Sequence, residues 1–208
     1  LPAREEDVLA RMPKKARADA RKARQEHDLV LDEGRWYVAD LVRLFHRNKR
    51  SLGSPAMPRR WFTEILTEFG RDATVHLVRR GAEPLAAVMS FFFRDTVLAY
   101  HSGTADGADR SYKASVFMYM ALQEWSVAAG YQTFDFGRSR KDSGPCQFKT
   151  HQGFEARDLH YRFRLVQDRA TPSLNPSNPK TKVLRETWSR MPLWLTTSLS
   201  SPAAKYLP

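Results

Sequence analysis

The sequence predicts an α+β domain, a mixed sheet flanked by helices. Apolar residues recur at helical spacing before residue 70, alternate at strand spacing from Ala73 to His101, and then follow helical and strand patterns in turn. Consecutive strands joined by tight turns imply antiparallel pairs, whereas a strand, a helix and a strand in succession imply a right-handed crossover and a parallel pair. Both kinds of pairing are therefore expected in one sheet.

Composition limits the class of protein. The 208 residues are 42% hydrophobic and 27% charged, which suits one globular domain with extensions. The net charge of +11 favours phosphates, nucleic acid or acidic headgroups as partners. Cys146 is the only cysteine, which excludes an intrachain disulfide and makes a reducing cytoplasm the expected compartment.

No stretch predicts a transmembrane segment. The longest apolar run, residues 85–93, is about half of the roughly 20 residues that a spanning helix needs. We expect a soluble, cytoplasmic protein that could also work at the inner face of the membrane. The opening residues do not form a signal peptide, and sequence preceding Leu1 is expected to be missing.

Three helical segments are predicted ahead of the sheet. Residues 11–24 carry seven cations, one acid and four alanines. Residues 36–45 are apolar at helical spacing, and residues 59–69 fit a further helix that Gly70 ends. The basic segment is either a solvated helix or an arm that contacts phosphate. The residues of such an arm are Lys14, Lys15, Arg17 and Arg21.

Three strands are then predicted as an antiparallel meander over residues 73–101. A largely apolar helix is expected over residues 112–129, with Ser111 as its N-cap and Gly130 as its stop. The remaining predicted elements are a strand over 131–137, a polar loop over 138–145, a short helix over 147–152, a strand or bent pair over 154–166, and an amphipathic helix around 181–190.

These elements suggest three parts. We expect a basic helical arm over residues 1–28, the α+β domain over 29–168, and a Pro-rich linker with a C-terminal helix and tail over 169–208.

The order of the elements is that of the GNAT acyltransferase fold, and one segment supports a closer resemblance. Phe134 to Ser139, Gly144, Phe148-Lys149, Gly153-Phe154-Glu155 and Leu159-His160-Tyr161 resemble the FemAB-related proteins, especially those associated with exosortase (PEP-CTERM) and exopolysaccharide loci, and through them the Fem-type aminoacyltransferases. The resemblance runs from about Met12 to Val166. Gln152 and Ser115 stand where such proteins usually have Trp and Asn, which leaves the identity of the substrate open.

The resemblance carries implications for architecture. Fem-type enzymes are built from two tandem GNAT domains with a cleft between them, and 208 residues hold one such domain plus a tail. We therefore expect the chain to be the C-terminal half of a larger enzyme. The N-terminal GNAT-like domain of that enzyme is expected to be missing from this sequence.

The resemblance also places Lys149 at the acyl-transfer site, facing the tRNA end. Attack of an amine on an ester builds an oxyanion, which a fixed ammonium stabilises. Asp135 and Arg138 flank the end of a strand, so they either take part in the site or form a structural ion pair. We place Asp135 with the catalytic residues, and Arg138, Ser139 and Phe148 with the substrate-binding residues.

The remaining candidate residues are suggested only by their position at the end of a strand or the start of a helix. Tyr100 and His101 lie at a strand end and could face the same cleft, with His101 as a candidate base or as a structural residue. Tyr112 and Lys113 begin the buried helix, where free N–H groups favour an anion, or they only cap it. Cys146 with His151 lacks an orienting Asn or Asp, and the six histidines show no metal-ligand spacing.

The acyl donor separates the functional hypotheses. Residues 104–110 contain one glycine and two acids where acetyl-CoA-using GNAT enzymes cradle a pyrophosphate, so an aminoacyl-tRNA donor is preferred over acyl-CoA, and no tightly bound cofactor is expected. The first hypothesis is Fem-type transfer of an aminoacyl or other acyl group to an amine of a cell-envelope or exopolysaccharide-related acceptor. The alternatives are an acetyl-CoA-dependent N-acyltransferase and a non-catalytic half-domain that binds polyanions.

Overall fold

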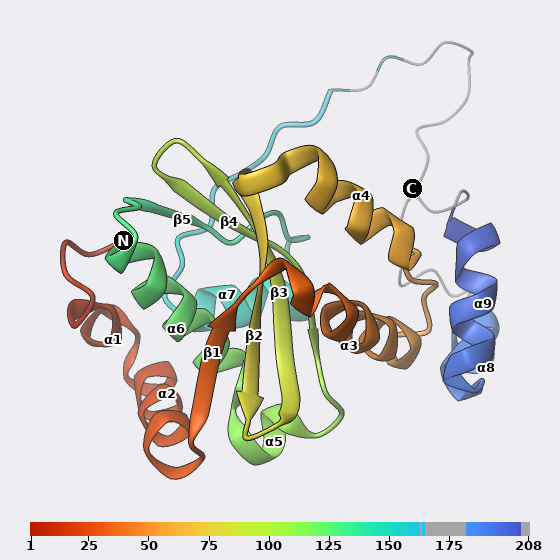
Figure 1. Ribbon diagram of the computed structural model, residues 1–208, viewed down its shortest axis with the longest axis horizontal. Helices are drawn as coiled ribbons and strands as arrows, with labels where there is room; N and C mark the ends of the chain where they lie inside the picture. The colour runs from red at the N-terminus through yellow and green to blue at the C-terminus, as the bar shows by residue number, and fades with distance from the viewer. Residues whose placement is uncertain (163, 165–181, 205–208) are drawn as a thin grey trace.

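The computed structural model describes residues 1–162, 164 and 182–204, and these residues form one five-stranded sheet with helices on both faces (Figure 1). The strands lie in chain order: β1 (Leu29–Glu33), β2 (Ala73–Arg80), β3 (Glu83–Phe93), β4 (Thr96–Thr104) and β5 (Thr133–Asp135). The first four are antiparallel neighbours, and β5 pairs with β4 in parallel. The predicted mixed sheet is confirmed.

One face of the sheet is covered by α2 (Lys14–Glu26) and α6 (Ala114–Ala128). Ala16, Ala20 and Ala23 of α2 recur one turn apart and are buried. Because alanine is small, α2 packs closely against α6, and Arg24 also pairs with Glu124 of α6. The other side of α2 carries exposed cations. The predicted basic helix therefore shares a hydrophobic core with the sheet.

The opposite face is covered by α3 (Val38–Ser51) and α4 (Arg59–Phe69), whose positions the sequence predicts well. Leu41, Leu44 and Phe45 of α3 join Phe62 and Leu66 of α4 in a second core cluster. The short elements of this half are η1 (Arg35–Tyr37), before α3, and η2 (Gly70–Asp72), after α4.

Strand β1 is absent from the sequence-based prediction. Its residues, Leu29 to Glu33, show no clear alternation of buried and exposed side chains. They pair with β2 in the register Leu29 opposite Arg80 and Glu33 opposite His76. A strand held by partners more than forty positions away along the chain has little local signal.

The predicted helix over 112–129 is wrong at its start. The chain forms α5 (Ala108–Tyr112), turns at Lys113 with φ +56°, and then forms α6. Ser111 lies inside α5 rather than at an N-cap. A left-handed backbone at a lysine interrupts the helix, and nothing in the local pattern indicates it.

The segment after β5 also differs from prediction. Helix α7 (Gly144–His151) begins three residues earlier than expected, because the Ser143 hydroxyl accepts the Cys146 N–H at 3.3 Å and Pro145 occupies the first turn. Residues 154–162 and 164 form no strand, contrary to the predicted strand or bent pair. The rest of that stretch, and the predicted linker up to residue 181, lie outside the described residues.

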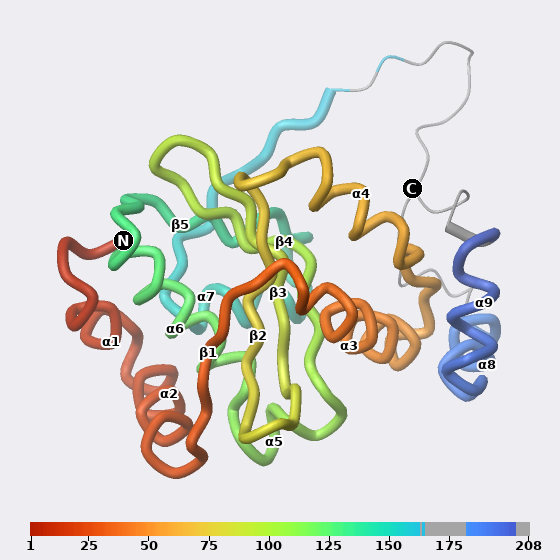
Figure 2. Tube along the Cα trace, viewed as in Figure 1, coloured from red at the N-terminus to blue at the C-terminus, as the bar shows by residue number. Residues whose placement is uncertain are grey.

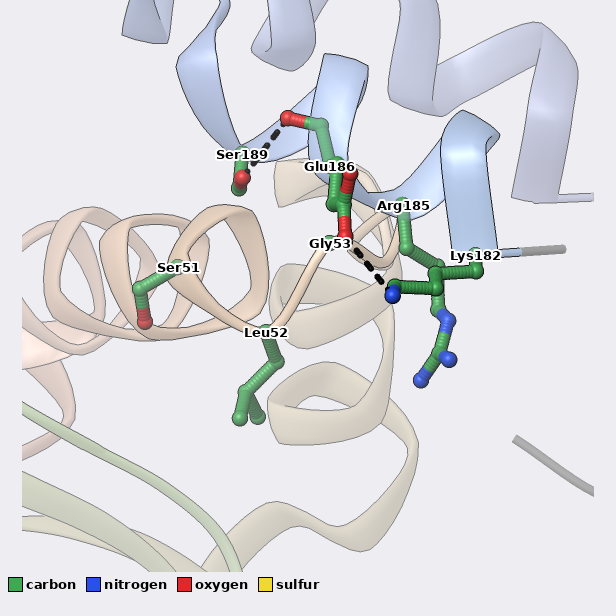
Figure 3. A pocket seen from close by; sticks show the side chains of 7 residues that line it. All are labelled: Ser51, Leu52, Gly53, Lys182, Arg185, Glu186 and Ser189. Carbon is green, nitrogen blue, oxygen red and sulfur yellow. Dashed lines mark hydrogen bonds and ion pairs between the residues drawn. The ribbon is translucent and has the colours of Figure 1, made fainter. Parts of the chain in front are cut away.

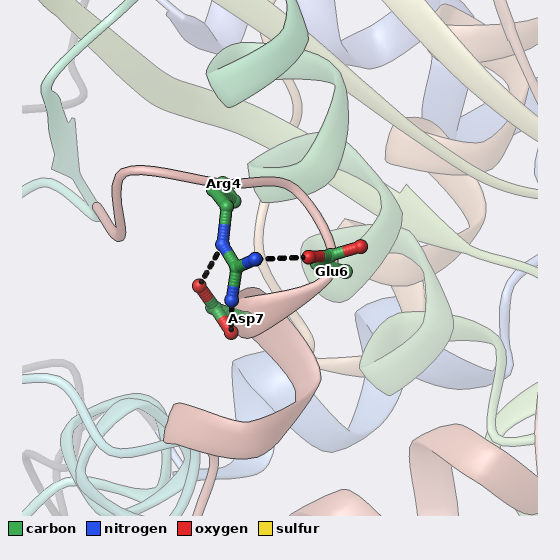
Figure 4. A network of polar contacts seen from close by, with 3 residues as sticks. All are labelled: Arg4, Glu6 and Asp7. Atoms are coloured by element: carbon green, nitrogen blue, oxygen red, sulfur yellow. Dashed lines mark hydrogen bonds and ion pairs between the residues drawn. The ribbon is translucent and has the colours of Figure 1, made fainter.

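The N-terminal segment runs beside β5, as the trace in Figure 2 shows, and the Leu1 amine donates to the Gln132 carbonyl at 2.9 Å. Arg4 then binds Glu6 at 2.7 Å and Asp7 at 3.0 Å before α1 (Asp7–Arg11; Figure 4). These ion pairs are exposed, so they contribute little to stability.

A C-terminal helical pair packs on the far side of α3 (Figure 1). It consists of α8 (Lys182–Arg190), which the sequence predicts, and α9 (Leu193–Ala204). None of the helices in the described part of the chain is long and apolar enough to cross a membrane.

Candidate active site

The first part of the candidate site is β4, which contains a bulge near Tyr100 and His101. Val88 pairs with Ser102 and Ser90 pairs with Ala99, so Tyr100 and His101 together oppose the single residue Met89. An extra residue bends a strand and leaves part of its ladder unpaired. The bulge therefore turns Tyr100 out of the regular sheet.

The second part of the candidate site is the end of β5. Strand β5 stops at Asp135, opposite Leu98, while β4 continues for six more residues. The Asp135 carboxylate accepts the Gly137 N–H at 2.7 Å, and Gly137 takes φ +64°, a conformation that favours glycine. The paired part of β5 ends here, and Gly137 still lies beside β4, since a Cβ on it would be 3.6 Å from the Leu98 side chain and 3.7 Å from the Tyr100 ring.

Lys149, on α7, reaches the end of β5. Its ammonium donates to the Gly137 carbonyl at 2.9 Å and to the Arg138 carbonyl at 3.3 Å, and it lies 5.1 Å from the centre of the Phe136 ring. Burial lowers the pKa of Lys149, while the nearby Asp135 carboxylate and Cys146 thiol oppose that shift. The charge is therefore half-buried at the end of β5 rather than directed into solvent.

Arg138, Ser139 and Phe148 are the other predicted residues of this region. The Arg138 guanidinium donates to the Tyr161 hydroxyl at 3.4 Å. The Ser139 hydroxyl is buried and makes no hydrogen bond within the described residues. Phe148 packs against Phe136 and Tyr119 with ring centres about 6 Å apart, which orients α7.

His101 is surrounded by aromatic side chains. Its ring lies 5.2 Å from Phe62 and 4.6 Å from Tyr100, and its Nε2 accepts the indole N–H of Trp61 at 3.4 Å. Burial, and after it the Lys49 cation, lower the pKa of His101 to about 4. The imidazole is thus neutral near pH 7, but the nitrogen that could accept a proton is already occupied.

Tyr112 and Lys113 lie at the junction of α5 and α6. Tyr112 contacts the rings of His27 and the guanidinium of Arg80, and Lys113 pairs with Asp19 of α2 at 3.9 Å. Their contacts join α2, β2 and α6. The structure shows no contact between either residue and Lys149, so they are not part of the group at the end of β5.

The four candidate phosphate contacts lie on α2. Lys14, Lys15 and Arg21 are exposed, whereas Arg17 donates to the Ala10 carbonyl at 3.2 Å. The start of α2 adjoins the end of α7, because a Cβ on Gly153 would lie only 2.8 Å from the Pro13 ring. Lys14 and Lys15 therefore begin a basic surface close to the helix that carries Lys149.

Asp109 is one of the two acids of the 104–110 segment, but the sequence does not indicate its contact with α6. Its carboxylate accepts the Ser115 N–H at 2.7 Å and the Ser115 hydroxyl at 2.9 Å, which closes the N-terminal end of α6. In the sequence, this acid lies six residues before Ser115. The two residues meet because the chain turns at Lys113, between α5 and α6. Among the described residues, no group of three His, Cys, Asp or Glu could hold a metal ion.

A family model described as an acetyltransferase (GNAT) domain matches residues 10–150. The chain belongs to this family. The mixed five-stranded sheet agrees with this family, and the matched segment includes α2, the ends of β4 and β5, and Lys149. An acyltransferase domain is thereby established, while its donor and acceptor are not.

Solved structures show the same fold. The structure of FemX aligns with a TM-score of 0.60 at 12% identity, over 71% of this GNAT domain chain and 55% of FemX. An aminoglycoside acetyltransferase from an uncultured soil metagenomic sample, in complex with sisomicin, aligns with a TM-score of 0.51 at 11% identity, over 66% and 97%. A ribosomal-protein-alanine N-acetyltransferase from Brucella melitensis biovar Abortus 2308 aligns at 0.50 and 11%, over 66% and 99%.

The chain thus spans about half the length of FemX and nearly the whole of the two acetyltransferases. At these identities the likeness is one of fold. A comparison with curated proteins finds no match.

Proposed function

We propose that this GNAT domain is the acyl-transfer half of a Fem-type enzyme, which moves an aminoacyl or other acyl group to an amine of a cell-envelope or exopolysaccharide-related acceptor. The observation that carries the proposal is the Lys149 ammonium held by the Gly137 and Arg138 carbonyls at the end of β5. An ammonium has three N–H donors, and the described residues supply acceptors for two of them. The third is free for a ligand.

The chemistry follows from that free donor. The acceptor amine attacks the carbonyl carbon of the donor ester, a C–N bond forms, and the carbonyl oxygen becomes an oxyanion. Lys149 donates its third N–H to that oxyanion, an interaction worth about 3 kcal/mol in comparable sites. The C=O bond then reforms, the ester C–O bond breaks, and the alkoxide leaves.

The proton lost by the amine needs an acceptor. We assign it to the Asp135 carboxylate, which is exposed and has one oxygen engaged by the Gly137 N–H. The proton then passes to the leaving alkoxide, so that charge and atoms balance. His101 suits this role less well, because Trp61 occupies its accepting nitrogen.

Two observations favour aminoacyl-tRNA over CoA as the donor. Asp109 occupies the N-terminal end of α6 with a carboxylate, which repels a pyrophosphate and engages an N–H that would bind it. The exposed cations Lys14 and Lys15 lie at the start of α2, next to the end of α7. Neutralised phosphates release counterions, so such a surface suits RNA.

The central test is Lys149→Met, with Lys141→Met as the matched control because Lys141 is exposed and pairs with Asp158. With aminoacyl-tRNA and an amine acceptor, we expect about 10²- to 10³-fold lower kcat for Lys149→Met, as for loss of other oxyanion donors, and no change for Lys141→Met. Lys149→Arg keeps a positive charge and should recover part of the rate. Full activity of a folded Lys149→Met variant would overturn the proposed role.

A binding experiment separates the donors. We expect tRNA binding to weaken with added salt and with the double change Lys14→Gln and Lys15→Gln, but not with Lys22→Gln, since Lys22 already pairs with Glu26. Tight calorimetric binding of acetyl-CoA would instead identify a CoA-dependent N-acyltransferase. Salt-sensitive tRNA binding without any transfer would identify a non-catalytic half-domain.

A further inference from the structure

Helix α9 buries two polar side chains and exposes a tryptophan, while Leu193 and Leu195 are half-buried. Thr196 and Ser200 are only 3% and 2% exposed. They lie on the side of α9 that packs against α3 and the segment after it. The Ser200 hydroxyl accepts the Ala56 N–H at 3.1 Å, and the neighbouring Thr197 hydroxyl contacts His46 at 3.2 Å. Trp194, by contrast, is 70% exposed. A helix that packs on a water-soluble domain normally turns its apolar side inward.

Helix α8 exposes its two aliphatic residues. Val183 and Leu184 are exposed, and none of the residues of α8 is buried. Arg185, Trp188 and Ser189 are half-buried, and the backbone of Arg185 lies against Gly53, where an added Cβ would come within 2.5 Å of the Arg185 carbonyl oxygen. The inward side of α8 thus carries one cation, one tryptophan and one serine, while Val183 and Leu184 remain outside.

The junction of α3 and α8 is shown in Figure 3. A hollow of about 300 Å³ lies between the end of α3 and α8, and Leu52, Lys182 and Arg185 are among the residues that line it. Leu52 is also exposed. Apolar and cationic side chains are thus interleaved along this edge of the molecule.

The charge of the region is positive. Helix α8 has three cations, Lys182, Arg185 and Arg190, and one acid, Glu186, while α9 has no charged residue. Apolar side chains bordered by Lys and Arg, with a Trp among them, are the combination that binds the headgroup region of an anionic bilayer. A protein partner would more often be met by an apolar centre with a mixed polar rim.

We propose that the C-terminal apolar surface, defined as Val183, Leu184, Trp194 and Leu199, lies on an anionic lipid bilayer. The exposed apolar side chains, with Trp194 as the anchor, enter the boundary between headgroups and acyl chains, and Arg190 contacts lipid phosphates, whereas Lys182 pairs with Glu186 at 3.9 Å. With 9 and 12 residues, α8 and α9 lie on the membrane and do not span it. This inference does not require the proposed acyl transfer.

Sedimentation of the intact chain with vesicles tests it. Vesicles of phosphatidylglycerol and phosphatidylethanolamine should bind the protein at least about tenfold better than phosphatidylcholine vesicles, and 0.5 M salt should release most of it. Trp194→Ser should weaken binding about tenfold. The matched control is Trp36→Ser, because Trp36 is 74% exposed but lies in η1, and it should bind like the natural chain.

A second measurement covers the case in which Trp194→Ser unfolds. Bromine-labelled anionic lipids should quench the tryptophan emission of the natural chain, Trp194→Phe should remove most of that quenching, and Trp36→Phe should not. No binding to anionic vesicles, or equal losses for the Trp194 and Trp36 variants, would overturn the proposal. So would a dimer in solution that Trp194→Ser dissociates, because a second copy would then cover the surface.

Discussion

Asp109 holds Ser115 through two hydrogen bonds, one from the backbone N–H at 2.7 Å and one from the hydroxyl at 2.9 Å. The Ser115 hydroxyl also contacts Thr104 at the end of β4, at 2.9 Å. The loop between β4 and α6 is thereby closed on itself. This closure satisfies the end of a buried helix with the protein's own carboxylate rather than with a ligand.

We therefore expect Asp109→Ala to lower the free energy of unfolding by about 1 kcal/mol, the usual cost of losing a helix cap. The control is Asp106→Ala, which changes an exposed acid of the same loop and should have little effect. Urea unfolding of both variants measures the difference. Equal stability of the two would show that the contact with Ser115 is not important for α6.

The buried His76 should make the protein sensitive to acid. Burial lowers its pKa to about 3 from the ordinary value of 6.5. As the pH falls, the unfolded chain therefore binds a proton at this histidine before the folded chain does. The contribution of His76 to the free energy of unfolding is fully present above about pH 6.5 and decreases as the pH falls toward 3, by at most about 1.4 kcal/mol per pH unit.

Urea midpoints of the natural chain, His76→Gln and His160→Gln at pH 7 and pH 5 check this. His76→Gln should flatten the pH dependence, although His101 contributes in the same direction, and the exposed His160 should not matter. An unchanged slope in His76→Gln would contradict the assignment.

Gly103 should be essential for packing β4 on α3. A Cβ at this position would lie 2.4 Å from the Phe45 backbone nitrogen and 2.5 Å from the Leu44 carbonyl carbon, and neither atom can move independently of its helix. We expect Gly103→Ala to destabilise the fold by about 3 kcal/mol, the upper range for overpacking a core.

Gly144 provides the control, since a Cβ there meets nothing within 4 Å and the residue begins α7. Gly144→Ala should be neutral or slightly stabilising. Thermal unfolding compares the two, and similar melting temperatures would argue against the close approach of β4 and α3.

The docking of α9 should depend on Ser200. Its hydroxyl accepts the buried Ala56 N–H, so Ser200→Ala leaves that donor without a partner and should cost about 1–3 kcal/mol. Ser198→Ala removes an exposed hydroxyl that bonds only within α9 and should cost much less. Limited proteolysis after α3 and urea unfolding both report the loss; equal behaviour would mean that other contacts hold α9.

Local patterns in the sequence determined much of the fold. The 3.6-residue spacing of apolar side chains predicts α3 and α4, and alternation with tight turns predicts the β2–β4 meander. These signals survive because each residue's burial depends on its position along its own element. The resemblance carried by Phe148 and Lys149 likewise predicts a site in this region, which stays a prediction.

Other features come from contacts between distant parts of the chain. Strand β1 forms on the edge of β2, Lys113 adopts φ +56° where α5 meets α6, and the Arg17 guanidinium donates to the Ala10 carbonyl. Sequence periodicity carries no information on such partners.

By itself, then, the sequence determined the class of fold and the order of most elements, and its resemblance to the Fem-type enzymes assigned a role in acyl transfer to one lysine. Only the tertiary structure decided that the Gly137 and Arg138 carbonyls accept hydrogen bonds from Lys149. It also decided that the Trp61 indole donates to His101 and that the Trp194 side chain of α9 is exposed. The physical reason is that hydrogen-bond partners and burial depend on distances between elements, and those distances exist only once the chain is packed.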